Sequence, residues 1–300
     1  MTNPFLEPMA PYPGLERYAR SVRLAQTGLN LFLFDAGPQD APPALLIHGL
    51  GDEADTWRHL IPALATKRRV LAMDLPGFGR SGKYSGGYSV PFFADVLLEA
   101  LDVLLPAGSH VVWIGHSLGA VISQHVALTR PERVAGLVLV DGCLLARSQK
   151  LDLATLMLLV PGLGERWYDG LRKKPQAAYR SLEPYYADLQ SMPEPERAFL
   201  FQRVNQRVWS DGQRRAFFGT IRSLARWLPA QQHGLAARLA ALSVPTLVLW
   251  GESDRMNSIQ NGLALLELQP AARLVTIPNA GHDAHQENPQ AVLAAVETAL

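Results

Sequence analysis

The stretch that decides the fold spans residues 110–129 and reads HVVWIGHSLGAVISQHVALT. Its first part, His110–Ile114, is β-branched and aromatic, which predicts a strand. Its last part, Leu118–Thr129, predicts a helix that ends near Pro131. Between them lies Gly115-His116-Ser117-Leu118-Gly119, a serine with a glycine two residues away on either side. This arrangement is typical of a nucleophile elbow, a tight turn that carries a serine from a strand into a helix.

The chemistry of this turn explains its residues. Gly115 and Gly119 leave the room that a tight, strained turn requires. Ser117 then lies at a helix N-terminus, where the helix dipole and the free N–H groups favour negative charge. His116 flanks the serine because the turn places it there, and we predict it as a substrate-binding residue.

Short apolar runs alternate with longer amphipathic segments on both sides of this stretch. Strands are predicted at Asn30–Asp35, Ala44–His48, Arg69–Met73, Val134–Val140, Pro245–Trp250 and Leu274–Ile277, and helices at Thr56–Thr66, Val90–Leu105, Gln260–Leu268 and Pro289–Leu300. Strands that are apolar on both faces and alternate with helices indicate a buried parallel sheet. The predicted fold class is therefore α/β, with a mostly parallel central sheet flanked by helices.

The alternation of strands and helices stops after Cys143. Residues 144–240 contain helix-like segments and no convincing strand. We therefore expect a core made of residues 1–143 and 241–300, with residues 144–240 inserted as a helical cap above the carboxyl edge of the strands. Met157 lies in an apolar run of this cap. We predict that it binds substrate in an apolar pocket, although a helix buried between cap and core would have the same composition.

Composition excludes several classes of protein. The 300 residues are 48% hydrophobic and 18% charged, so the chain can bury a large core and is not globally disordered. A net charge of +1 argues against a nucleic-acid-binding protein. No apolar run reaches the roughly 18 residues of a transmembrane helix. One cysteine excludes an internal disulfide, and the N-terminus lacks the pattern of a signal peptide, so we expect a cytoplasmic protein.

A serine hydroxyl is a weak nucleophile and needs a base. After an elbow of this type the expected chain order is serine, then aspartate or glutamate, then histidine. Asp254 follows the predicted strand Pro245–Trp250, and His282 follows the predicted strand Leu274–Ile277. Both therefore lie at the same sheet edge as Ser117, and we predict the three residues as a catalytic triad.

Each partner of the serine has rivals. Asp141 ends another strand and could also reach a histidine. Glu252 is two residues from Asp254, but a residue so close to the strand end is less free to turn inward. His285 lies three residues after His282, where a helix is expected to start, which favours a place at that helix N-terminus or in the pocket wall.

Acyl transfer also needs two N–H donors that point at the developing oxyanion. One is the backbone N–H of Leu118, the residue after the nucleophile. The other should come from the segment His48-Gly49-Leu50-Gly51, which follows a predicted strand. Its glycines permit the backbone to come close to the substrate, and the backbone N–H of Leu50 is the expected donor.

Taken together, these motifs resemble the α/β-hydrolase fold family. The matching segments are His48–Gly51 (the oxyanion loop), Asp74–Gly82 (the loop after the fourth strand), Gly115–Gly119 (the elbow), Trp250–Asp254 (the acid loop) and Gly281-His282 with Glu287 and Pro289 (the histidine loop). The resemblance covers nearly the whole chain outside residues 144–240, which correspond to the family's cap. Members that open epoxides or remove halide carry aspartate at the elbow, so Ser117 implies acyl transfer.

The predicted function is hydrolysis of small-molecule carboxylic esters with an apolar acyl or aryl part, without a metal or cofactor. Residues 144–240 hold 15 Lys/Arg and 8 Asp/Glu, so the expected cap is basic. One alternative is therefore a carbon–carbon bond hydrolase or a lactonase with the same triad, because a basic cap is compatible with an anionic substrate. A second alternative, of another class, is a non-catalytic protein that binds a ligand or partner in the old pocket. Such proteins typically lack a triad residue.

Overall fold

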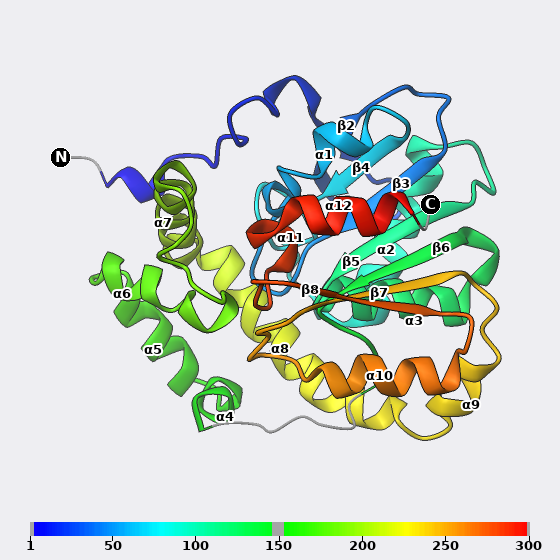
Figure 1. Cartoon of the computed structure of the whole chain (residues 1–300). Coiled ribbons are helices and arrows are strands. Elements are labelled where there is room, and N and C mark those ends of the chain that lie inside the picture. The colour runs from blue at the N-terminus through cyan, green and yellow to red at the C-terminus, as the bar shows by residue number, and fades with distance from the viewer. Residues whose placement is uncertain (1–2, 146–152, 299–300) are drawn as a thin grey trace.

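The structure is a computed structural model that describes residues 3–145 and 153–298. Within them, one sheet has the strand order β1-β2-β4-β3-β5-β6-β7-β8 (Figure 1). The strands are β1 (Ala19–Arg23), β2 (Asn30–Ala36), β3 (Pro43–Ile47), β4 (Arg69–Met73), β5 (Val111–His116), β6 (Val134–Val140), β7 (Thr246–Gly251) and β8 (Arg273–Ile277). The β1–β2 and β2–β4 pairs are antiparallel and the others are parallel. The predicted α/β class with a mostly parallel sheet is confirmed.

Helices cover both faces of this sheet (Figure 1). One face packs against α2 (Val90–Leu104), α3 (Leu118–Thr129) and α10 (Ile259–Leu268). The other face packs against α1 (Ile61–Leu64) and α12 (Pro289–Glu297). The short helix α11 (Ala284–Glu287) directly precedes α12. Burial of apolar side chains on both faces of the strands is what holds these layers together.

The central strands follow the predictions closely because they are buried on both faces. The prediction for β6 agrees with the structure at both ends, and so does the prediction for α3. Every residue of β5 is buried. Such strands appear in the sequence as continuous apolar runs, which makes their bounds easy to place.

Two elements differ from the predictions at the N-terminal side. The edge strand β1 was not predicted, because only Val22 of its five residues is buried and the strand has no apolar alternation. The helix predicted at Thr56–Thr66 is instead a 3₁₀ turn, Ala54–Trp57, followed by the short α1. Pro62 explains the break, because proline cannot donate the backbone hydrogen bond that a continuous helix needs at this position.

Between β6 and β7 the described chain is helical, as α4 (Leu153–Leu159), α5 (Leu163–Leu171), α6 (Pro175–Arg180), α7 (Glu194–Trp209), α8 (Asp211–Gln231) and α9 (Leu235–Ala240). Helices α4 to α7 lie to one side of the sheet, and α8 runs back toward it (Figure 1). Side chains from residues 171–208 form an apolar cluster of their own. The predicted cap boundaries, 144 and 240, remain a prediction, and residues 146–152 lie outside the described residues.

Buried ion pairs attach α7 to the loop after β3. The Arg207 guanidinium pairs with Asp52 and, at 2.7 Å, with Glu53. Arg203 reaches the same Glu53 carboxylate at 3.1 Å. Paired charges of this kind hold two segments in one register, because breaking one pair leaves an uncompensated buried charge. The loop that we expect to supply an oxyanion donor is therefore braced by α7.

No helix in the described part of the chain is long and apolar enough to cross a membrane.

Candidate active site

The turn after β5 is as tight as its sequence predicts. Ser117 has a φ of 51°, which a non-glycine residue adopts only at a cost of about 1–3 kcal/mol. A Cβ at Gly115 would lie 2.3 Å from the carbonyl of Gly119, and a Cβ at Gly119 would lie 2.2 Å from the carbonyl oxygen of Ile47. The Ser117 N–H donates to the carbonyl of Val140 at 2.9 Å. The serine is thus held in a strained conformation at the carboxyl edge of the sheet.

A chain of two hydrogen bonds connects Ser117, His282 and Asp254. His282 Nε2 lies 3.0 Å from Ser117 Oγ, and His282 Nδ1 lies 2.9 Å from Asp254 Oδ2. The side chains of His282 and Asp254 are 4% and 1% exposed. A carboxylate at Nδ1 keeps the proton on that nitrogen, which leaves Nε2 free to accept the proton of the serine hydroxyl.

The acid loop itself orients Asp254. Its Oδ1 accepts from the backbone N–H groups of Met256 and Asn257, at 2.8 and 2.9 Å. Because one carboxylate oxygen is held by the loop, the other is aimed at His282. The structure therefore brings together the three residues predicted from three separate segments of the sequence.

The rival residues lie elsewhere. Glu252 is exposed, and its carboxylate accepts from the N–H of Asn279 at 3.4 Å. His285 is fully buried, lies 2.7 Å from Thr56 Oγ1 through its Nε2, and packs against Trp57. His285 is therefore a structural residue of the protein core and not part of the described cavity wall.

The segment expected to supply an oxyanion donor is held from inside the protein. His48 is fully buried; its Nε2 accepts from the N–H of Leu75 at 2.9 Å, so its Nδ1 carries the proton and donates to Gly49 at 2.7 Å. Burial lowers the pKa of His48, which keeps it neutral. Leu50 and Leu118 both line the cavity beside Ser117. Leu118 begins α3, so its N–H has no intrahelical acceptor. Their role as donors stays a prediction.

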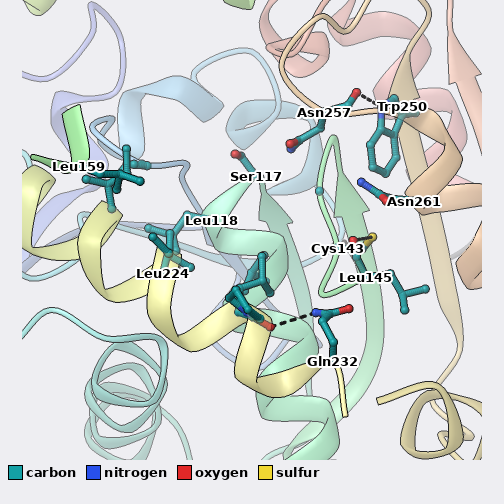
Figure 2. A pocket seen from close by; sticks show the side chains of 17 residues that line it. Ser117, Leu118, Cys143, Leu145, Leu159, Leu224, Gln232, Trp250, Asn257 and Asn261 are labelled. Carbon is teal, nitrogen blue, oxygen red and sulfur yellow. Dashed lines mark hydrogen bonds between the residues drawn. The ribbon is translucent and has the colours of Figure 1, made fainter. Parts of the chain in front are cut away.

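An open cavity of about 410 Å³ lies over Ser117 (Figure 2). Its described lining residues are Leu50, Ser117, Leu118, Val121, Gly142, Cys143, Leu145, Leu159, Ile221, Leu224, Ala225, Leu228, Pro229, Gln232, Trp250, Asn257 and Asn261. None of these side chains carries a charge, since burial raises the pKa of the Cys143 thiol to about 12. The cavity is of the size that holds a small organic ligand, and most of its wall is apolar.

The side-chain amides in this wall have partners within the protein. Gln232 Nε2 donates to the carbonyls of Leu144 and Leu228, at 3.0 and 3.1 Å. Asn257 Nδ2 donates to the carbonyl of Asp141 at 2.7 Å. In Figure 2 the side chain of Ser117 lies between Asn257 on one side and Leu118 with Leu224 on the other. A ligand in this cavity would therefore meet mainly apolar groups.

Two predicted substrate-binding residues are not in the described cavity wall. Met157 is half-buried in α4, whereas Leu159 of the same helix lines the cavity. Two residues apart in a helix are about 200° apart around its axis, so these side chains point in nearly opposite directions. His116 is buried and faces the histidine loop: its Nε2 donates to the carbonyl of His282 at 2.8 Å. Burial lowers the pKa of His116 to about 3, so it is neutral.

The main wall of the cavity was missed by sequence reasoning. It comes from α8, whose Ile221, Leu224, Ala225 and Leu228 all face the cavity. Their spacing of i, i+3, i+4 and i+7 is the apolar stripe of an amphipathic helix, and this signal was available. Trp250 and Asn261 carry no such signal, because only the packing of β7 and α10 directs them toward the cavity.

His116, Asp283 and His285 form a buried cluster of the side-chain types that bind metals, with ligand atoms within 4.8 Å of one another. Side chains of this cluster already form hydrogen bonds within the protein. His116 donates to the backbone of His282, and His285 pairs with Thr56. These contacts support the loop that carries His282, and we assign the cluster this structural role.

The stability of the protein should fall with rising pH because of Asp283. Burial, and next the charge of Asp52, raise the pKa of Asp283 to about 7, from an ordinary value of 3.8. In the unfolded chain Asp283 loses its proton around pH 4, whereas in the folded protein it keeps the proton up to about pH 7. The resulting loss of folding free energy grows between these two pH values. Relative to the parent protein, Asp283→Asn should thus gain thermal stability as the pH rises from 4 to 7, by about 2 °C or more.

The measurement is the melting temperature of both proteins across that pH range. The exposed Asp40→Asn is the matched control, and its difference from the parent should not vary with pH. A flat difference for Asp283→Asn would show that Asp283 is ionised in the folded protein well below pH 7.

Comparison with known proteins places this geometry in a family. The family model described as alpha/beta hydrolase fold matches residues 42–289. A solved structure of Cfl2 from Burkholderia cenocepacia aligns with a TM-score of 0.79 at 23% identity, covering 97% of this chain and 99% of that one. At this identity the likeness concerns the fold alone.

Characterised relatives differ in activity. The dihydrolipoyllysine-residue acetyltransferase component of an acetoin cleaving system from Pseudomonas putida is 29% identical over 266 residues, 87% of this chain; this chain spans only 64% of that relative. A 2-hydroxy-6-oxononadienedioate/2-hydroxy-6-oxononatrienedioate hydrolase from P. putida is 30% identical over 279 residues, 91% of both chains. A pimeloyl-[acyl-carrier protein] methyl ester esterase from Aeromonas hydrophila is 28% identical over 277 residues, 85% of this chain and 94% of the relative.

Proposed function

This chain belongs to the alpha/beta-hydrolase fold family, and we propose that it is a serine hydrolase that cleaves carboxylic esters with an uncharged, apolar acyl or aryl part. The observation that carries the proposal is the hydrogen-bonded chain from Asp254 through His282 to Ser117, which ends at the wall of an apolar cavity. A methyl ester esterase among the relatives supports ester chemistry on this fold.

The reaction follows from these contacts. Ser117 Oγ attacks the ester carbonyl carbon while His282 Nε2 takes the serine proton. The N–H groups of Leu50 and Leu118 stabilise the negative oxygen of the tetrahedral intermediate. His282 then gives the proton to the leaving alcohol, and the acyl group remains on Ser117. A water molecule, deprotonated by His282, attacks the acyl carbon and releases the acid, while Asp254 holds the histidine ring in place throughout.

The region between β6 and β7 shapes the acyl pocket in this proposal. Residues 144–240 act as a cap, with Leu159 and the apolar stripe of α8 as the pocket wall. The carbon–carbon hydrolase relative is the second candidate, and its name denotes a dicarboxylate substrate. A dianion is costly to bury without cationic partners, and the described wall of this cavity holds no charged side chain. The uncharged wall therefore favours a neutral ester.

The direct test is hydrolysis of p-nitrophenyl esters from acetate to palmitate, beside a dienedioate substrate of the carbon–carbon hydrolase class. We expect hydrolysis of neutral esters with a maximum at one acyl length. Cleavage of the dienedioate without ester hydrolysis would favour the second candidate. Failure with both substrates, together with no labelling of Ser117 by a serine-directed phosphonate, would favour a non-catalytic binding protein.

Filling the pocket should shift the preferred acyl length. Leu224→Trp puts a larger side chain into the wall, so kcat/KM for long-chain esters should fall by about tenfold or more, while that for acetate changes little. Arg226→Trp, exposed on the same helix, is the matched control and should leave the chain-length profile as it is. An unchanged profile for Leu224→Trp would mean that the acyl group lies elsewhere.

A further inference from the structure

Asp141 lies beside the acid loop in an unusual backbone conformation. It directly follows β6, has a φ of 51° and is fully buried. Its N–H donates to the carbonyl of Leu249 on β7 at 2.9 Å, and the preceding carbonyl, of Val140, accepts from Ser117. A non-glycine residue keeps such a conformation only where its surroundings hold it there.

The Asp141 carboxyl is hydrogen-bonded to the loop that carries the proposed acid and faces the backbone of the loop that carries the proposed base. Asp141 Oδ1 accepts from the N–H of Gly251 at 2.6 Å, three residues before Asp254. The backbone N–H of Ala284, two residues after His282, also faces this carboxyl and opposes the rise of its pKa. One side chain thus spans the acid loop and the histidine loop.

Asn257 connects Asp141 to Asp254. The Asp141 carbonyl accepts from Asn257 Nδ2 at 2.7 Å, and the N–H of Asn257 donates to Asp254 Oδ1 at 2.9 Å. The close packing of the two loops leaves little freedom here: a Cβ at Gly251 would lie 1.9 Å from the carbonyl oxygen of Gly281. Small movements of Asp141 would therefore change the separation of Asp254 and His282.

The charge state of Asp141 is set by its surroundings. Its Oδ2 is buried and has no hydrogen-bond partner among the described residues. Burial, and next the charge of Asp254 on the acid loop, raise the pKa of Asp141 well above its ordinary value, and Asp283 on the histidine loop acts in the same direction. Two carboxylates in one buried site do not both ionise readily, and the raised pKa of Asp141 favours its neutral form.

We infer that Asp141 is a positioning residue: a neutral carboxyl that joins the acid loop to the histidine loop and fixes the contact between Asp254 and His282. The inference rests on the proposed function, because it assigns Asp141 a part in that reaction. It also separates Asp141 from the role of the acid, since a neutral carboxyl does not stabilise a histidinium as Asp254 does.

Two substitutions test the inference. Asp141→Asn keeps a neutral side chain with an oxygen that can accept the Gly251 N–H, and asparagine tolerates a positive φ. Asp141→Gly removes the acceptor and relieves the backbone strain at the same time. The readouts are kcat and KM for the preferred ester, the pH dependence of kcat/KM, and the melting temperature from pH 4 to pH 9.

We expect Asp141→Gly to lower kcat by about tenfold to a hundredfold, with KM within about threefold, because loosened positioning weakens the transition state more than substrate binding. Asp141→Asn should rescue kcat to at least about a third of the parent value and leave the shape of the pH profile unchanged. Its melting temperature should rise relative to the parent as the pH increases, because the parent must keep its proton on Asp141 in the folded state.

Three results would overturn the inference. Full activity in Asp141→Gly would show that the contacts do not matter. An Asp141→Asn variant as inactive as Asp254→Asn would show that Asp141 acts as a charged acid. A melting-temperature difference that falls with rising pH would show that Asp141 is ionised. If the parent protein shows neither Ser117-dependent hydrolysis nor labelling by a phosphonate, the proposed function fails, and the inference fails with it.

Discussion

Replacing Ser117 with alanine should lower kcat/KM for the preferred ester by on the order of 10⁴-fold to 10⁶-fold. The hydroxyl is the only protein group in the proposed mechanism that bonds to the acyl carbon, so its loss removes the acyl-enzyme pathway. What remains is the modest catalysis that substrate binding and the oxyanion donors provide. Alanine occupies the same backbone conformation and makes no new contact, so the melting temperature should change little.

The measurement is steady-state hydrolysis of the best p-nitrophenyl ester by both proteins, with burst-phase release of p-nitrophenol as a count of active serines. Ser123→Ala is the matched control. Ser123 lies on the helix that begins next to Ser117, it is buried, and its hydroxyl donates to the Gly119 carbonyl rather than to a proposed catalytic residue. That variant should keep its activity. A Ser117→Ala protein with more than about a tenth of the parent activity would exclude Ser117 as the nucleophile.

Asp254→Asn should lower kcat by on the order of 10³-fold to 10⁴-fold while leaving the fold intact. Asparagine can still accept the N–H groups of Met256 and Asn257 with its oxygen, so the acid loop keeps its shape. Its amide group then faces His282 Nδ1 and favours the wrong tautomer of the histidine. The imidazole loses both its orientation and the negative charge that stabilises the histidinium.

The comparison with Glu252→Gln decides which carboxylate is the acid. Glu252 is exposed and two residues away, so the substitution changes the charge of the same loop without touching His282. It should leave kcat within about threefold of the parent. Loss of activity in Glu252→Gln together with activity in Asp254→Asn would reverse the assignment, and both variants should be measured from pH 5 to pH 9 because the histidine must be neutral to accept a proton.

Local features of the sequence were enough to predict the fold class and the elbow. The bounds of β6 and α3 could be predicted because a strand buried on both faces and a helix with a regular apolar period leave strong short-range signals. The edge strand β1 leaves no such signal, since its residues are mostly exposed. The helix breaks at Pro62 because proline lacks a backbone N–H. In the sequence this single-residue signal was weaker than the helical pattern of the apolar residues around it.

The candidate site divides in the same way. The elbow motif and the chain order led to the prediction of Ser117, Asp254 and His282, because the ends of parallel strands meet at one edge of the sheet, but they left Asp141 and Glu252 as rival acids. Sequence order could not show that His116 turns toward the histidine loop, or that Leu159 rather than Met157 faces the cavity. Those choices depend on which side of a turn or a helix packs against distant residues.

What the sequence by itself determined is therefore the backbone: the strand–turn–helix of the elbow, the parallel sheet, and the order of the three predicted catalytic residues. Only the tertiary structure decided the surroundings of those residues, including the apolar wall from α8 and the contacts of Asp141 with two loops more than a hundred residues away in the chain. The physical reason is the distance along the chain over which each property is set. Backbone geometry and helical period are set by neighbours within a few residues, whereas burial, charge state and side-chain direction are set by contacts that exist only once the sheet has formed.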